Sequence, residues 1–219
     1  MIGLFSDSDG DLAAFDAAYE LLREKGARRF IFAGGRFSDL DDWARMRQRR
    51  RAGGGYSDLD FLADVTNFLG EQGQVERPPA FSDEEPAPAG GAEDIEKVKS
   101  RFLRVAEKGS AHSGDATLAM DMLGDVLCCV VHDKNDLGRE DLLNATVFIH
   151  GGAPEPKVIQ IGPRFFVTSG PLSGGERQTC GLLEVLERNL RFSAFSLDGS
   201  TVMEGQVLTV ERRTKLSVK

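Results

Sequence analysis

Short apolar runs and helical spacings alternate along the first part of the chain. Ile2–Phe5 is an apolar run of strand length, and apolar residues then recur three and four positions apart from Leu12 to Leu22, which predicts one face of a helix. Gly26 ends this helix, and Phe30–Ala33 reads as a second strand. The pattern therefore predicts a β-α-β unit whose two strands are parallel.

The pattern changes after this unit. A helix is expected over Trp43–Arg51, and Ser57 can cap another helix with apolar residues from Phe61 to Leu69. Residues 78–92 hold four prolines and three consecutive acids, so we expect a variable insertion or mobile loop there. A helix or irregular segment is expected from about Ile95 to Val105.

The second half reads as a series of short strands. Val126–Val131 is a continuous apolar run typical of a buried strand. The strands that follow are closely spaced and separated by Gly, Pro or Asp-Gly, which is the pattern of antiparallel strands. They are Val147–Ile149, Val158–Ile161, Arg164–Val167, Gly181–Val185, Leu190–Phe195 and Gln206–Val210. The whole pattern predicts a layered α/β sandwich forming a single domain over residues 1–219.

Composition and charge argue against some binding partners and favour one cellular compartment. The 219 residues include 27 Lys and Arg against 35 Asp and Glu, a formal net charge of −8, which argues against general binding to nucleic acid or to an anionic membrane. Cys128 and Cys129 are neighbours in a predicted strand, so they point to opposite faces and do not pair. Unpaired thiols, together with the lack of a signal peptide or a membrane-spanning run, predict a cytoplasmic protein of bacterial type.

Three acids follow the first strand, and Asp7, Asp9 and Asp11 allow several interpretations. Asp-x-Asp-Gly after a strand resembles the nucleophile loop of haloacid-dehalogenase-type phosphatases, although Asp11 stands where that family has Thr or Val. A calcium loop of the EF-hand type would need Glu at its twelfth position, where this chain has Ala18. The structural alternative is that Asp9 or Asp11 caps the helix beginning at Leu12.

Two histidines also stand at predicted strand ends. His132 follows Val131, and His150 follows Ile149 and precedes Gly151-Gly152. Ligands of open α/β sheets bind at the carboxyl ends of strands, so both are candidate site residues, and the alternative is a hydrogen-bonded structural role. His112 is expected in a loop.

The order of these blocks resembles the calcineurin-like metallophosphoesterases, especially the YfcE-like branch. Phe5-Ser-Asp7-Ser-Asp9-Gly resembles that family's Asp-x-His-Gly opening, Phe32-Ala-Gly-Gly35 its Gly-Asp block, and Val131-His-Asp133 its strand-end His. Ile149-His-Gly-Gly152 and the strands up to Leu172 are similar to its closing block, which contains Gly-His-Thr-His and Asn-Pro-Gly-Ser. The resemblance covers most of the chain except about 36–105 and implies a layered α/β/β/α sandwich.

The departures from the family pattern concern its two-metal centre. Asp7 and His132 are retained, but Asp9 replaces the first histidine and Gly35 replaces the Asp that would bridge the metals. Gly152 and Pro154 replace the two histidines of Gly-His-Thr-His. The resemblance therefore implies a vestigial pocket at Asp7, Asp9, Gly35, His132, His150 and Gly152 and a fold that has lost its reaction.

A basic run is the strong charge cluster of the chain. It consists of Arg45, Arg47, Arg49, Arg50 and Arg51. No aromatic residues alternate with these arginines, so an acidic protein partner, or the chain's own acids at 83–85, fits better than nucleic acid, and a solvated helix face is the structural alternative.

We therefore expect a non-catalytic protein-binding or regulatory module without a cofactor. The alternative is an active phosphoesterase with a reduced site, in which Asp7, Asp9 and His132 hold one divalent metal such as Mn²⁺. Edge strands near the C-terminus offer a route to a homodimer.

Overall fold

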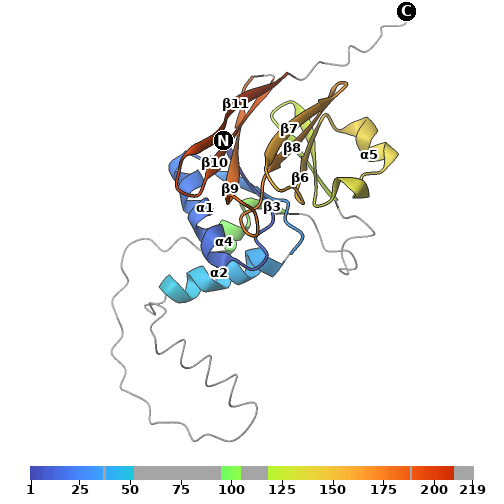
Figure 1. Ribbon diagram of the computed structural model, residues 1–219. Coiled ribbons are helices and arrows are strands. Elements are labelled where there is room, and N and C mark those ends of the chain that lie inside the picture. Colours follow the sequence, from blue (N-terminus) through green and yellow to red (C-terminus); the bar gives the residue numbers. More distant parts are fainter. Residues whose placement is uncertain (37, 52–94, 105–117, 188, 210–219) are drawn as a thin grey trace, which may run out of the picture.

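Two β-sheets pack face to face, with helices on their outer faces (Figure 1). The computed structural model describes residues 1–36, 38–51, 95–104, 118–187 and 189–209. Along the chain the elements are β1 (Ile2–Phe5), α1 (Leu12–Glu24), β2 (Arg29–Phe32), α2 (Ser38–Arg51), α4 (Ile95–Lys99), β3 (Phe102–Arg104), β4 (Leu118–Leu123), β5 (Val126–Val131), the 3-10 helix η1 (Lys134–Asp136), α5 (Arg139–Asn144), β6 (Val147–His150), β7 (Pro156–Ile161), β8 (Arg164–Ser169), β9 (Thr179–Val185), β10 (Asn189–Ser196) and β11 (Thr201–Thr209).

The strands form two separate sheets. The six-stranded sheet runs β11-β10-β9-β1-β2-β3, and the five-stranded sheet runs β4-β5-β6-β8-β7. β1 and β2 are parallel, as are β5 and β6, so the parallel pair predicted at the N-terminus is confirmed. The predicted α/β/β/α sandwich is confirmed as well.

The alternation of side chains along β1 and β2 explains the layering. Leu4 and Ile31 face the second sheet and join an apolar core between the sheets. Phe5, Phe30 and Phe32 point the other way and pack with α1, α2 and Phe102 in an aromatic core. Each strand of this pair is therefore buried on both faces, which is why its sequence is apolar except for the exposed Arg29 at the start of β2.

Helix α1 begins and ends where its sequence indicates. The Asp11 carboxylate accepts a hydrogen bond from Ala14 N at 2.9 Å, which confirms Asp11 as the cap of this helix. Gly26 follows the last turn with φ of 94°, a left-handed conformation that glycine adopts without strain.

Some elements differ from their prediction. α2 begins at Ser38, five residues before the predicted start, and Phe102–Arg104 forms a strand where a helix or irregular segment was expected. β8 is antiparallel to β7 but pairs in parallel with β6, so the strands of the second half are not all antiparallel. The predicted helix after Ser57, the segment 78–92 and His112 lie outside the described residues.

β4 and α5 were missed by the sequence analysis. β4 pairs with β5 at an edge of the five-stranded sheet, and Met120 and Met122 in it are exposed, so it lacks the apolar alternation of a half-buried strand. α5 has six residues, fewer than two helical turns, which is too short for apolar spacing to reveal it. No helix in the described part of the chain is long and apolar enough to cross a membrane.

The three cysteines are free and buried. Cys128 lies in the core between the sheets, whereas Cys129 packs beneath α5, so these neighbours face opposite sides of β5 as predicted. Burial raises the pKa of Cys128, Cys129 and Cys180 to about 12, which leaves each of them a protonated, apolar group.

Candidate functional site

The loops after β1, β2, β5 and β6 meet where the two sheets adjoin. The site residues predicted in these loops include Asp7, Gly35, His132 and Gly152, and hydrogen bonds and close contacts join them across the sheets. Strands of parallel pairs end at a common edge, which explains why residues so far apart in sequence lie together.

Asp7 is held by backbone amides from both sheets. Its Oδ1 accepts a hydrogen bond from Gly35 N at 3.2 Å, and its Oδ2 accepts one from Gly152 N at 2.7 Å. The Ser6 hydroxyl donates to the same Oδ2 at 3.0 Å. The Asp7 side chain is 16% exposed, so this carboxylate acts as a clamp among three strand-end loops.

His132 fills the space beside Gly35. Its Nδ1 lies 3.1 Å from the carbonyl oxygen of Ala33 and 3.4 Å from Asp7 Oδ1. A carbonyl oxygen only accepts, so Nδ1 carries the hydrogen. A Cβ added at Gly35 would lie 2.6 Å from His132 Nε2, and one added at Gly151 would lie 2.8 Å from Nδ1. The imidazole therefore occupies the volume that a side chain at Gly35 would need, whereas at Gly151 the carbonyl oxygen of Ala33 is closer still, at 2.3 Å.

Asp9 contacts other partners. Its Oδ2 accepts a hydrogen bond from the Ser173 hydroxyl at 3.1 Å, and the Arg36 guanidinium lies 3.5 Å from its carbonyl oxygen. Its φ is 46°, a left-handed conformation that Asp tolerates better than most residues. Asp9 thus joins the β1 loop to the loop after β8.

Asp39 is a buried carboxylate that the sequence analysis missed. It lies in the first turn of α2, its side chain is fully buried, and its Oδ2 accepts hydrogen bonds from Ser8 Oγ at 2.6 Å and Gly10 N at 2.9 Å. Arg36 Nε lies 3.0 Å from its Oδ1. Asp39 therefore fixes the loop that carries Asp7 and Asp9. A signal was present, since an acid in the first turn of a helix is placed to accept backbone hydrogen bonds.

The sequence and the structure were each compared with those of known proteins, and only the structure gave matches. The sequence matches no protein-family model and no curated protein sequence. The structure matches that of Escherichia coli YfcE, described as a phosphoesterase, with 17% identity and a TM-score of 0.53 over 96% of this chain and 99% of YfcE. It also matches Vps29 from Chaetomium thermophilum, with 12% identity and a TM-score of 0.57 over 99% of this chain and 98% of Vps29.

The chain has the calcineurin-like phosphoesterase fold. The resemblance seen in the sequence is thus confirmed for the fold. Both matches are under 25% identical, so they show the fold and do not by themselves imply catalysis.

A two-metal centre is what the resemblance to this family implies, and the residues present do not fit one. Gly35, Gly152 and Pro154 offer no side-chain donor. Both oxygens of Asp7 accept hydrogen bonds from backbone amides, while Asp9 contacts Ser173. Among the described residues, no three His, Cys, Asp or Glu side chains lie close enough together to hold a metal ion. Of the three residues that the one-metal alternative needs, Asp7 and His132 are in contact, whereas the Asp9 carboxylate contacts Ser173.

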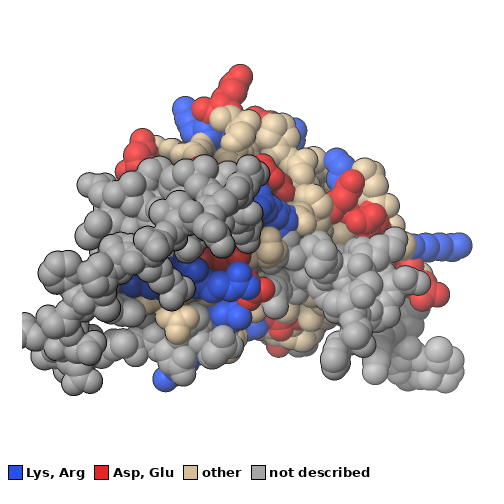
Figure 2. All heavy atoms as spheres, turned by 90° about the horizontal axis from the view of Figure 1, so that it is seen from below, with Lys and Arg blue, Asp and Glu red and all other residues tan. Residues whose placement is uncertain are grey.

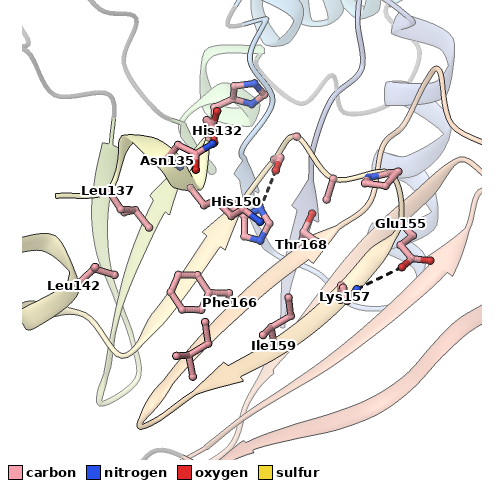
Figure 3. Close-up of a pocket in the computed structure, with 17 residues that line it drawn as sticks. His132, Asn135, Leu137, Leu142, His150, Glu155, Lys157, Ile159, Phe166 and Thr168 are labelled. Atoms are coloured by element: carbon pink, nitrogen blue, oxygen red, sulfur yellow. Dashed lines mark hydrogen bonds and ion pairs between the residues drawn. The ribbon is translucent and has the colours of Figure 1, made fainter. Parts of the chain in front are cut away.

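His150 is the last residue of β6 and lies beneath a pocket. Its Nδ1 lies 2.8 Å from the carbonyl oxygen of Gly151, and burial lowers its pKa, so it is neutral at pH 7. The pocket has a volume of about 660 Å³ and opens on the outer face of the five-stranded sheet (Figure 3). His150 is hydrogen-bonded as its structural alternative required, and it also borders this pocket.

The basic run lies on α2 and much of it contacts acids of the same fold. The Arg47 side chain is 12% exposed, pairs with Asp16 at 3.0 Å and Glu20 at 2.5 Å on α1, and lies over the ring of Tyr19. Arg50 also pairs with Asp16. Figure 2, which views the side where α2 lies, shows Lys and Arg atoms beside Asp and Glu atoms.

The remaining members of the run differ from Arg47. Arg45 is exposed and pairs with Asp42 at 2.9 Å on its own helix, and Arg49 is exposed. The side chain of Arg51 lies outside the described residues. Part of the run thus stabilises the contact between α1 and α2, and its use as an interaction surface stays a prediction.

Proposed function

We propose that this chain is a non-catalytic binding protein built as a single domain on a phosphoesterase fold. The observation that supports this most is the lack of a side-chain donor at Gly35, Gly152 and Pro154, where the resemblance implies metal ligands. In a metal-dependent phosphoesterase the metal ions would clamp the phosphate and activate water. Asp7, which the resemblance implies as a remaining ligand, here accepts hydrogen bonds from Gly35 N and Gly152 N.

The packing of His132 supports the same proposal. Its ring lies so close to Gly35 that a side chain at that position requires the ring to move. Replacement of the bridging acid by glycine and inward packing of the imidazole are therefore coupled changes. They convert a site for metal ions into a junction between loops.

Charge also disfavours a metal-free reaction on phosphate. Asp7 and Asp9 are both acids at the same strand end, and without a cation they repel an anionic phosphoryl group. The alternative, a phosphoesterase with one metal on Asp7, Asp9 and His132, requires these three side chains to come closer together than they lie here. We place the protein in the cytoplasm, where its free cysteines stay reduced, and we expect its partner to be a protein.

Hydrolysis of a generic phosphodiester tests this proposal. The full chain is incubated with bis(p-nitrophenyl) phosphate and Mn²⁺, beside YfcE as the positive control. We expect release of p-nitrophenol no faster than in protein-free buffer. Turnover that depends on Mn²⁺ and disappears in Asp7→Asn would overturn the proposal and establish the one-metal alternative.

A further inference from the structure

The outer face of the five-stranded sheet is covered over only part of its width. α5 packs over β5 and β6, where Cys129, Ala145 and Phe148 form a small buried cluster. The neighbouring face, on β8 and β7, carries Phe166 and Ile159. The pocket of about 660 Å³ lies over this second part, between α5 and the β7 edge (Figure 3).

The floor and one wall of the pocket are apolar. Phe166 and Ile159 form the floor and Leu137 and Leu142 stand opposite β7 (Figure 3). The apolar surface continues beyond the enclosed part, because Ile159 is 38% exposed and Ile161, at the end of β7, is 61% exposed. Exposed apolar side chains beside an apolar pocket offer a surface on which apolar side chains of a ligand can pack.

The charges around the pocket balance. Lys134 and Lys157 face it, but so do Asp133 and Glu155, and Lys157 pairs with Glu155 at 3.8 Å. The neighbouring His150 is neutral at pH 7 because burial lowers its pKa. An anionic ligand such as a phosphate or a nucleic acid therefore gains little here, whereas an uncharged apolar group matches the floor.

We propose that this pocket binds a segment of a protein partner that presents two or three aliphatic or aromatic side chains. The volume is within the range that holds drug-sized ligands, which is ample for several side chains. β7 also lies at the end of the strand order, so an extended segment beside it can hydrogen-bond to the sheet edge. This inference rests on the proposed protein-binding function but not on the loss of catalysis.

The experiment uses a displayed library of random short peptides selected on the full chain. Affinities of the selected peptides are measured by fluorescence polarisation for the wild type and for Ile159→Glu and Ile161→Glu. Both positions are exposed, so these variants fold, which is checked by thermal unfolding. Val207→Glu, at an exposed apolar residue of β11 outside the pocket, is the matched control.

We expect selected peptides with two or three apolar positions, and a loss of affinity of about tenfold or more in both pocket variants with no change in the control. Peptides that bind the pocket variants as well as the wild type would overturn the inference, as would a library that yields no binder. Neither result bears on phosphodiester hydrolysis, so the failure of this inference and the failure of the non-catalytic proposal are distinguishable.

Discussion

Asp7 offers the sharpest contrast between a structural carboxylate and a catalytic one. Its oxygens accept hydrogen bonds from Gly35 N, Gly152 N and the Ser6 hydroxyl. In Asp7→Asn the side chain keeps one oxygen and turns an NH₂ group toward a backbone N–H, so at least one amide loses its acceptor. We therefore predict that this substitution destabilises the protein.

The magnitude follows from the contacts. A hydrogen bond to a charged group contributes about 1.5–3 kcal/mol, and the bond from Gly152 N lies at the exposed end, where water replaces it at lower cost. We expect a loss of about 2–3 kcal/mol in the free energy of unfolding. For a chain of this size each kcal/mol lowers Tm by about 2–4 °C, so Tm falls by about 4–12 °C.

The matched control is Asp9→Asn. Asn tolerates the left-handed backbone at this position, and its amide oxygen can still accept from Ser173. We expect a change within about 0.5 kcal/mol. Differential scanning fluorimetry and urea unfolding compare the three proteins without added metal. A carboxylate kept for metal binding is commonly unfavourable for stability, so a Tm of Asp7→Asn at or above that of the wild type would refute this reasoning.

Three further predictions concern buried groups. Asp39→Asn weakens the bonds that the buried Asp39 side chain accepts from Ser8 and Gly10, and urea unfolding should show a loss of about 2–3 kcal/mol. The surface variant Asp42→Asn should lose about 0.5 kcal/mol or less, and equal losses would contradict the role given to Asp39. Burial lowers the pKa of His150, so below about pH 6.5 the unfolded chain binds a proton that the folded chain does not, and the free energy of unfolding decreases as the pH is lowered. His150→Gln should make this pH dependence shallower, and an unchanged pH dependence would contradict the assignment. The three cysteines should not react with Ellman's reagent in the folded protein near pH 8 and should all react after unfolding, and labelling of the native protein would show that a thiol is accessible.

The fold could be predicted from the sequence because its strands are short apolar runs with clear ends. Ile2–Phe5, Val126–Val131 and Val147–Ile149 were each located to within about a residue. β4 could not be found this way, because it lies at a sheet edge and its exposed methionines blur the alternation.

The sequence indicated which residues lie at the candidate site, but it did not indicate what they contact. Strand ends placed Asp7, Gly35 and His132 together, yet no spacing shows that the imidazole fills the space beside a glycine. Asp39 was missed because the predicted helix began at Trp43, which left Asp39 outside its first turn. The pocket on the outer face could not be predicted from the sequence, because its lining comes from several segments and the distances between those segments depend on packing.

Arg47 shows how a charge cluster can mislead. In the sequence it belongs to a run that favours an exposed interaction surface, and in the fold its guanidinium lies between Asp16, Glu20 and two aromatic rings. The two acids lie four residues apart on α1 and so share one face of that helix, which lets a single guanidinium contact both of them.

The central claim is that this strand-end junction has lost the ability to hold metal ions, and the number of Mn²⁺ ions retained per chain tests it most directly. The purified full chain is incubated with Mn²⁺, excess metal is removed, and bound Mn²⁺ is counted by mass spectrometry, with YfcE treated in parallel. We predict that the protein retains none and that its Tm is unchanged by Mn²⁺. Two ions per chain, or one ion that is lost in Asp7→Asn, would contradict the claim.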